Sequence, residues 1–322
     1  MVLKSLNRSF LVAALFCQLG LANTSYAASA KPVCDGRQVQ LQVLGSGGPE
    51  MTDGRASTSY LIWVDKKARI LVDFGSGAAL NYEKSHANPA DLQAVLFSHF
   101  HVDHTADFPA IVKGLGFTKF NDEIQVYGPT KNNGFPGTKE FLSALFDREK
   151  GAYAYLANAT DPDASNQFKV EANEVPPTEG QVVSFELGDD TILKAISIPH
   201  GAAPSLAWRV ETHGCALTFS GDTSNSNKAL ENLAAESDLF VAHNAAQEND
   251  SDAIARELHM MPSEIGRIAK AAAVKQVVLS HRMLRTLGKE KETLQAIRKN
   301  YAGSVQFAND LQVFRLGDAA KH

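Results

Sequence analysis

The feature that most constrains how this chain folds is the stretch His99-Phe100-His101-Val102-Asp103-His104, which follows an apolar run at 94–97. It places three imidazoles and one carboxylate within six positions. His99 and His101 stand two apart, so extended backbone turns both side chains to the same side. Nitrogen donors combined with carboxylates suit zinc. The stretch therefore predicts a metal site rather than a group of solvated histidines, and the fold must bring further donors to it.

Three candidates for those donors lie far along the sequence. His200 follows the β-rich segment 191–198, Asp222 follows the mostly apolar run 217–220, and His281 follows 277–280. A single His or Asp in such a place is more often a turn or capping residue. These three share one placement, at the C-terminal end of a run where a loop begins. We therefore predict that they complete the metal site.

The rest of the chain is rich in β-runs with helical segments between them. Helices are predicted at 108–115, 138–156, 228–236, 262–273 and 294–301, and strands at 39–44, 59–64, 70–74, 91–98, 124–127, 168–170, 182–187, 191–198, 206–211, 216–220, 239–242, 276–280 and near 305 and 313. We interpret this α/β mixture as a two-sheet sandwich flanked by helices, formed by one domain at 31–322. Within it, residues 131–166 form an insertion with one helix, either a lid or a plain connector.

The first 30 residues have the layout of a secretory signal peptide. Lys4 and Arg8 precede a mostly apolar segment at 10–21, and small residues at 25–30 offer a cleavage site. A membrane anchor is the alternative, but the apolar segment is shorter than the roughly 20 residues of a typical span. We expect cleavage, and a periplasmic or secreted mature protein that is not held in a membrane.

After cleavage the chain would carry 29 Lys and Arg against 36 Asp and Glu, a net charge of −7. Such a protein gains little from the counterion release that drives nucleic-acid binding, so we expect no nucleic-acid partner. Two cysteines remain, Cys34 and Cys215. In an oxidising compartment they either pair or stay as two separate thiols, and the sequence leaves both readings open. A homo-oligomer is also compatible with the sequence.

The seven donors, in this order, resemble the metallo-β-lactamase superfamily, whose hallmark is His-x-His-x-Asp-His followed by a His, a bridging Asp and a last His. The resemblance runs from about Val39 to the C-terminus and implies an αββα four-layer sandwich with two zinc ions. The implied ligands of the first ion are His99, His101 and His200, those of the second are Asp103, His104 and His281, and the bridge is Asp222. A hydroxide between the ions would be the nucleophile. Flavin-linked di-iron members carry Glu at the position of His101, so a hydrolase is expected rather than an oxygen reductase.

The second half of the chain is similar to the ribonuclease Z and arylsulfatase-like branch. The similar stretches are Ser220-Gly221-Asp222-Thr223, Leu239-Phe240-Val241-Ala242-His243, Leu258-His259-Met260-Met261-Pro262 and Val278-Leu279-Ser280-His281. In that branch the histidine matched by His259 lies near the leaving group, which implies a proton donor or an electrostatic clamp. We predict His259 and the ligand Asp103 as catalytic residues. One departure is Asn244, where ribonuclease Z-like chains often have Glu, and it argues against tRNA processing.

The expected reaction is hydrolysis of a small anionic ester, either an aryl sulfate or a phosphodiester. The runner-up is a lactonase or β-lactamase acting on a carbonyl, and a non-catalytic zinc-binding protein is the alternative of another class. Asp73, at a strand end, is predicted to orient a ligand histidine. Aromatic side chains of the insertion either line a pocket for an aryl group or form the buried face of a helix: Phe135, Phe141, Phe146, Tyr153 and Tyr155.

Overall fold

The computed structural model describes residue 34 and residues 38–165, 168–188 and 190–316, all within the compact unit Pro32–His322. The expected signal peptide at 1–30 lies outside the described residues. In the described part of the chain, no helix combines the length and the apolar character that crossing a membrane requires.

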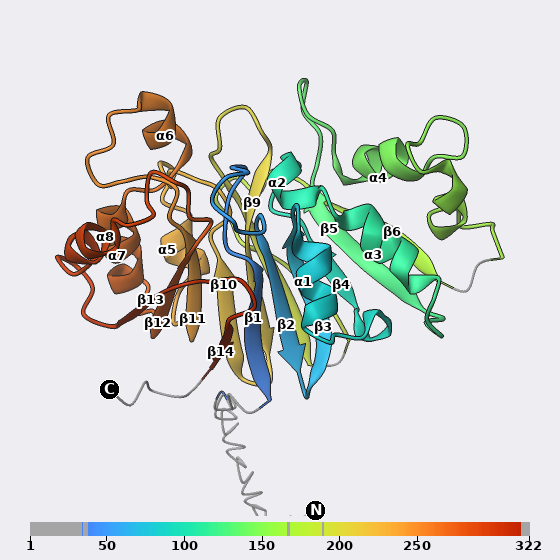
Figure 1. The fold of residues 1–322 in the computed structure, drawn as a ribbon, viewed down its shortest axis with the longest axis horizontal. Coiled ribbons are helices and arrows are strands. Elements are labelled where there is room, and N and C mark those ends of the chain that lie inside the picture. Colours follow the sequence, from blue (N-terminus) through green and yellow to red (C-terminus); the bar gives the residue numbers. More distant parts are fainter. Residues whose placement is uncertain (1–33, 35–37, 166–167, 189, 317–322) are drawn as a thin grey trace, which may run out of the picture. The chain divides into compact units, whose positions relative to one another are not determined.

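Two seven-stranded sheets form the centre of this unit (Figure 1). The first contains, in order, β14 (Val313–Arg315), β1 (Val39–Gly45), β2 (Ser59–Val64), β3 (Lys67–Phe74), β4 (Ala94–Leu96), β5 (Glu123–Pro129) and β6 (Lys169–Val175). The second contains, in order, β13 (Ser304–Phe307), β12 (Gln276–Ser280), β11 (Leu239–His243), β10 (Cys215–Phe219), β9 (Ser205–Thr212), β8 (Thr191–Ile198) and β7 (Val183–Glu186). Strands β3 to β6 are parallel, as are β10 to β13, and the other pairs are antiparallel.

Apolar side chains fill the space between the sheets and cover their outer faces. The inner core joins residues of both sheets, such as Val72 of β3 and Leu217 of β10. The outer face of the first sheet packs against α1 (Ala78–Lys84), α3 (Phe108–Leu115) and α4 (Thr138–Phe146), and that of the second against α5 (Leu230–Leu233), α7 (Pro262–Ala271) and α8 (Glu290–Ile297). Strands such as β10 and β11 are buried on both faces, which explains their continuous apolar runs. The predicted αββα sandwich is confirmed.

Several local predictions are wrong in detail. The amphipathic stretch 138–156 is not one helix, because α4 ends before Asp147, whose carboxylate accepts hydrogen bonds from the backbone of Glu149 and Lys150. A 3₁₀ segment, Ala154–Ala159, follows it. The helix predicted at 228–236 shrinks to α5, and the one at 294–301 begins earlier, at the start of α8. Helices α1 and α6 (Ala253–Leu258) and the 3₁₀ turn Pro89–Asp91 were not predicted.

A disulfide joins Cys34 to Cys215, the first residue of β10. The sequence left open whether the two cysteines pair or stay separate, and in the structure they are paired. The bond connects positions 181 residues apart in the sequence, and it fastens the start of the described chain to the second sheet. In the chain-entropy account, a cross-link over so long a loop removes much of the freedom of the unfolded chain.

We expect Cys34→Ala to lower the free energy of unfolding by about 2–5 kcal/mol, because the variant loses this cross-link. The measurement is denaturant unfolding of both proteins with and without a reductant. Reductant should lower the midpoint of the native protein towards that of the variant and leave the variant unchanged. Equal midpoints for all four samples would show that the bond does not stabilise the fold.

Candidate metal centre

The predicted ligands meet at one edge of the sandwich, where the carboxyl ends of several strands lie together (Figure 1). His99 comes three residues after the end of β4 in the first sheet. In the second sheet, His200 follows β8, Asp222 follows β10 and His281 follows β12. Open α/β sheets generally bind ligands at this end of their strands. The sequence placed the donors correctly at strand ends, and the fold brings all seven together.

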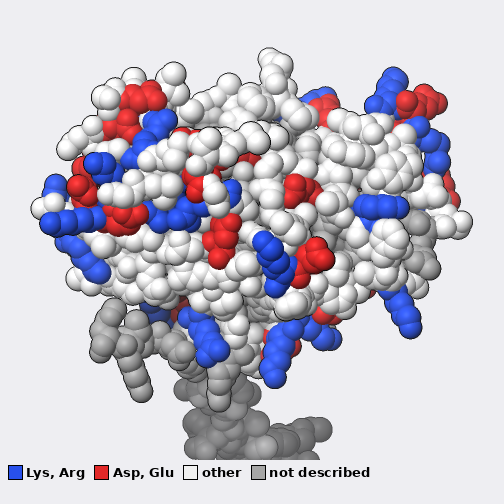
Figure 2. Space-filling view, in the orientation of Figure 1, with Lys and Arg blue, Asp and Glu red and all other residues white. Residues whose placement is uncertain are grey.

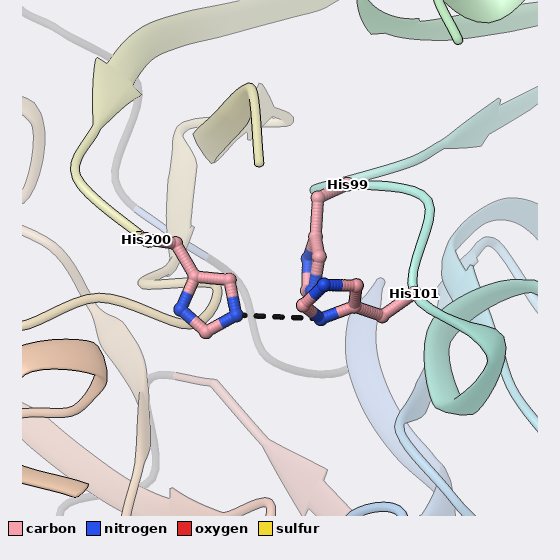
Figure 3. A group of neighbouring side chains, drawn as sticks. All are labelled: His99, His101 and His200. Carbon is pink, nitrogen blue, oxygen red and sulfur yellow. Dashed lines mark hydrogen bonds between the residues drawn. The ribbon is translucent and has the colours of Figure 1, made fainter. Parts of the chain in front are cut away.

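The first group of donors is His99, His101 and His200, whose candidate ligand atoms lie within 4.8 Å of one another (Figure 3). The ring of His99 lies 4.4 Å from that of His101 and 4.8 Å from that of His200, measured between centroids. His200 Nε2 faces His101 Nδ1 at 3.4 Å. Nitrogens from three side chains thus converge on one small volume, as a cation site requires.

The second group is Asp103, His104, Asp222 and His281, all buried. His281 Nε2 lies 3.3 Å from Asp103 Oδ2 and 3.2 Å from Asp222 Oδ2. The same Asp222 oxygen lies 3.6 Å from His104 Nε2 and 3.8 Å from His200 Nε2 of the first group. Asp222 therefore stands between the two groups, where the resemblance placed a bridging ligand. Asp103 and His104 lie on the short helical turn α2 (Val102–Thr105), which was not predicted.

Buried nitrogens that make no hydrogen bond among the described residues indicate that cations fit this site. His99 Nε2, His104 Nε2 and both ring nitrogens of His281 are buried and make no hydrogen bond among the described residues. A buried polar atom left unsatisfied costs roughly 1–3 kcal/mol, so a protein seldom retains several in one place without a ligand. Histidine nitrogens and carboxylate oxygens form the donor set that zinc prefers. The residues present thus fit the predicted metal.

The other faces of the ligand rings are held by hydrogen bonds. Asp73 Oδ2 lies 2.8 Å from His104 Nδ1, and Ser98 Oγ lies 3.0 Å from His99 Nδ1. Ser98 also donates to Asp73, through its hydroxyl at 2.8 Å and its backbone N–H at 2.7 Å. These contacts turn the Nε2 atoms towards the site. The predicted role of Asp73 agrees with this geometry, whereas the role of Ser98, inside the most informative stretch of the sequence, was missed.

Backbone strain accompanies two of these residues. Asp73 has φ of 54° and His281 has φ of 50°, a left-handed conformation that residues other than Gly and Asn adopt at a cost. Gly75, two residues after Asp73, allows a close approach, since a Cβ there would lie 2.0 Å from the carbonyl oxygen of Asp103. The close packing at Gly75 places α2 against β3, and the contacts around Asp73 and His281 must outweigh the cost of their backbone conformation.

Burial and charge set the protonation states. Burial lowers the pKa of His99 and His200, which favours the neutral imidazole that can ligate a cation. Burial opposes the charge of His281 too, but Asp222 and Asp103 raise its pKa to about 9. Burial acts to raise the pKa of Asp103, but His104 and His281 lower it to about 2. The carboxylates of the centre are therefore charged at neutral pH and attract cations.

His259, the predicted catalytic residue, lies beside both groups. Its ring centroid is 5.6 Å from that of His200 and 5.8 Å from that of His281. Its Nδ1 is buried and makes no hydrogen bond among the described residues, and burial lowers its pKa to about 4. It follows the last residue of α6 and precedes α7, so it does not belong to either helix. The backbone of the preceding Leu258 also supports His200, through a contact of 3.2 Å to Nδ1.

The aromatic residues of the insertion differ in burial and in their distance from the candidate ligands. Phe146 is fully buried in the outer core, and Phe141 packs there against Phe100, with ring centroids 4.6 Å apart. Tyr155 is 69% exposed and lies under the ammonium of Lys113. Only Phe135, of the five predicted, has a ring contact with a ligand, 5.9 Å from the ring of His101. The helix-face reading therefore applies to Phe141 and Phe146, and Phe135 is the residue at the metal centre.

Comparisons with known proteins agree with this geometry. The family described as "Beta-lactamase superfamily domain" matches residues 68–282, more than half of the chain. A ribonuclease Z from Mycobacterium sp. (strain KMS) is 29% identical over 255 residues, covering 76% of this chain and 84% of the relative. The structure of the short form of human tRNase Z superposes with a TM-score of 0.67 at 19% identity, covering 86% of this chain and 99% of that one.

A further solved structure, unliganded yeast PDE1, superposes with a TM-score of 0.63 at 10% identity, covering 87% of this chain and 99% of that chain. The two structural likenesses concern the fold, and the family match rests on the sequence itself. The chain thus belongs to the β-lactamase superfamily, as a metal-dependent hydrolase with the metallo-β-lactamase fold.

Proposed function

We propose that this protein is an exported hydrolase with two zinc ions that cleaves a small anionic ester, with a phosphodiester as the first candidate and an aryl sulfate as the second. The observation that carries the proposal is the position of Asp222 Oδ2, which lies 3.2–3.8 Å from nitrogens of both donor groups. A carboxylate oxygen so placed is suited to serve two adjacent cations. Relatives named ribonuclease Z and a neighbour named PDE1 support phosphorus–oxygen chemistry.

Different residues of the chain would have different roles in this reaction. The three histidines of the first group and the four residues of the second would hold the ions, which when bound activate water and stabilise charge on the transferring group. Asp103, a ligand whose carboxylate is already ionised, adds negative charge that strengthens cation binding. His259 lies on the side of His200 and His281, where it would donate a proton or a hydrogen bond to the leaving oxygen.

Charge around the centre supports a small substrate rather than RNA. Three cations on nearby loops are already paired with carboxylates: Lys131 with Glu140, Arg282 with Glu290 and Arg285 with Asp252. The face seen in Figure 2 mixes Lys and Arg with Asp and Glu, and its blue atoms do not form one continuous patch. Binding of a polyphosphate backbone depends on several free cations. Asn244, buried beside His243, also lacks the carboxylate expected for tRNA processing.

Apolar side chains near the ligands favour a substrate with an apolar group. Val102, between His101 and Asp103, is 68% exposed, and Leu284, three residues after His281, is 47% exposed. The backbone of Leu284 bonds to the side chain of Glu50, next to Met51, which is 96% exposed. With Phe135, these side chains come from four separate segments. Exposed apolar residues gathered near a polar site commonly contact a ligand.

The proposal predicts that the zinc-loaded protein turns over a nitrophenyl phosphodiester faster than a nitrophenyl sulfate, and either faster than a lactone or β-lactam reporter. Removal of metal with a chelator should abolish turnover, and added zinc should restore it. Preference for the sulfate would make the second candidate the function. Turnover of the carbonyl substrates alone would establish the runner-up, and two bound zinc ions without any turnover would establish a non-catalytic zinc-binding protein.

Export is the other part of the proposal. The disulfide between Cys34 and Cys215 supports it, because such bonds persist mainly in oxidising compartments. The basic and apolar pattern of the first 30 residues supports it independently. We propose that the mature protein acts in the periplasm or outside the cell.

A further inference from the structure

A buried pair of residues that the proposed chemistry does not use contacts Asp222 through Oδ1, the carboxylate oxygen that does not face the donor nitrogens, and the ring of His243 stacks on that of His281. His243, the last residue of β11, places Nδ1 2.6 Å from Asp222 Oδ1. Tyr60 of β2 places its hydroxyl 3.0 Å from His243 Nε2. His243 is 2% exposed and Tyr60 is fully buried. The three residues form one chain of hydrogen bonds that crosses from the first sheet to the second.

The chemistry of these groups fixes which atom donates at each step. Asp222 is a carboxylate and can only accept, so His243 Nδ1 must carry the proton and donate it to Oδ1. In the neutral ring the other nitrogen then has a lone pair, which accepts the hydrogen bond from the hydroxyl of Tyr60. Tyr60 therefore selects the tautomer of His243 that donates to Asp222. The backbone N–H of His243 also donates to Ser220 Oγ at 3.1 Å, which holds the residue in place.

One oxygen of Asp222 is occupied by this chain and the other is free to face the donors. Oδ1 accepts from His243, whereas Oδ2 is the oxygen that lies near His104, His200 and His281. Turning the carboxylate to offer both oxygens to one cation would bend or break the hydrogen bond from His243. The carboxylate presents a single oxygen to the space between the two groups.

We propose that Tyr60 and His243 are positioning residues, which hold Asp222 with Oδ2 facing both donor groups, where it would serve as a metal ligand. This inverts the usual arrangement, in which a carboxylate orients a histidine ligand, as Asp73 orients His104 in this protein. The inference rests on the proposed function, because it requires Asp222 to be a ligand. It assigns a task to two residues that lie outside the ligand set.

The test compares His243→Leu with His243→Asn. Asparagine places an amide N–H near the position of Nδ1 and can still donate to Asp222, whereas leucine cannot. Zinc affinity is measured by competition with a chromogenic chelator, and the cobalt-substituted proteins are compared by their visible absorption spectra. We expect His243→Leu to bind at least one ion about 10–100-fold more weakly, with an altered cobalt spectrum. His243→Asn should recover most of the affinity and the native spectrum.

Tyr60→Phe provides a milder variant that keeps the ring and loses only the hydroxyl. It should weaken zinc binding less than His243→Leu does, but measurably. Its matched control is Tyr82→Phe, because Tyr82 is also buried and its hydroxyl makes no hydrogen bond among the described residues. This control should bind zinc as the native protein does.

The outcomes separate this inference from the proposed function. If His243→Leu is folded and binds both ions with native affinity and spectrum, the positioning role is refuted while the metal centre stands. Equal losses in the leucine and asparagine variants would also refute it, because the hydrogen bond would not be the cause. If the native protein binds no metal, the proposed function itself fails.

Discussion

Replacing His101 by alanine is expected to reduce turnover about a thousandfold or more and to lower the zinc content of the protein. His101 Nδ1 lies 3.4 Å from His200 Nε2, so the variant loses one of three nitrogens that converge on the first site. Metal ions supply several kcal/mol of stabilisation to the charge that develops in hydrolysis, and each 1.36 kcal/mol corresponds to about tenfold in rate. Steady-state kinetics on the best ester and metal analysis of the same sample measure the two effects together.

The fold should survive this change, because His101 is only half-buried and lies at the edge of the sandwich. The matched control is His86→Asn, at an exposed turn with φ of 59°, a conformation that asparagine tolerates. It should keep native activity and native zinc content. Full activity in His101→Ala would contradict the two-group metal site, whereas loss of activity with the zinc content unchanged would assign His101 to substrate binding instead.

Replacing His259 by alanine is expected to reduce kcat on esters of poorly acidic alcohols by about 10²–10⁴-fold while the zinc content stays native. Its ring lies within 6 Å of two ligand rings, yet it is outside both donor groups. The loss should depend on the leaving group if the imidazole donates a proton. A nitrophenolate leaves readily without help, so the defect should be small with nitrophenyl esters and large with esters of poorly acidic alcohols.

A defect of equal size for all leaving groups would instead indicate a hydrogen bond to charge on the transferring group. A metal-depleted His259→Ala protein would contradict both roles and place the residue among the ligands. The added readout of zinc content is what distinguishes these cases, because activity alone falls in each of them.

The sequence was sufficient for the layered fold and for the seven candidate donors, whereas their division into two groups came from the family resemblance. Apolar runs that end in His or Asp, at 94–99, 217–222 and 277–281, indicate strands buried on both faces and the edge where they end. The run at 191–200 ends at the same edge, but its strand has one partly exposed face. Those signals are strong because a strand's burial shapes every residue in it. The family's donor pattern is recognised from the order of the residues alone, without any distance between them.

What the sequence could not provide depends on contacts between distant segments. Tyr60 has the pattern of an ordinary aromatic residue in a strand. Its partner His243 lies 183 positions away, and no local sequence pattern links the two. Ser98 is a small residue, and its role depends on its hydrogen bonds to two imidazoles and one carboxylate from other positions. The helical turn α2 was missed because four residues are too few to show helical periodicity. The break at Asp147 came from local side-chain hydrogen bonds that compete with the helix.

The division of the donors between the two sheets has a consequence for assembly. His99, His101, Asp103 and His104 belong to the edge of the first sheet, whereas His200, Asp222 and His281 belong to that of the second. A chain in which only one sheet has formed holds neither complete group, so tight zinc uptake must follow the docking of the sheets. Bound ions would then connect the two sheets and stabilise their docked state by mass action. Under the proposed function, the chain would acquire its metal where it completes its folding, which for an exported chain is the compartment in which its disulfide closes.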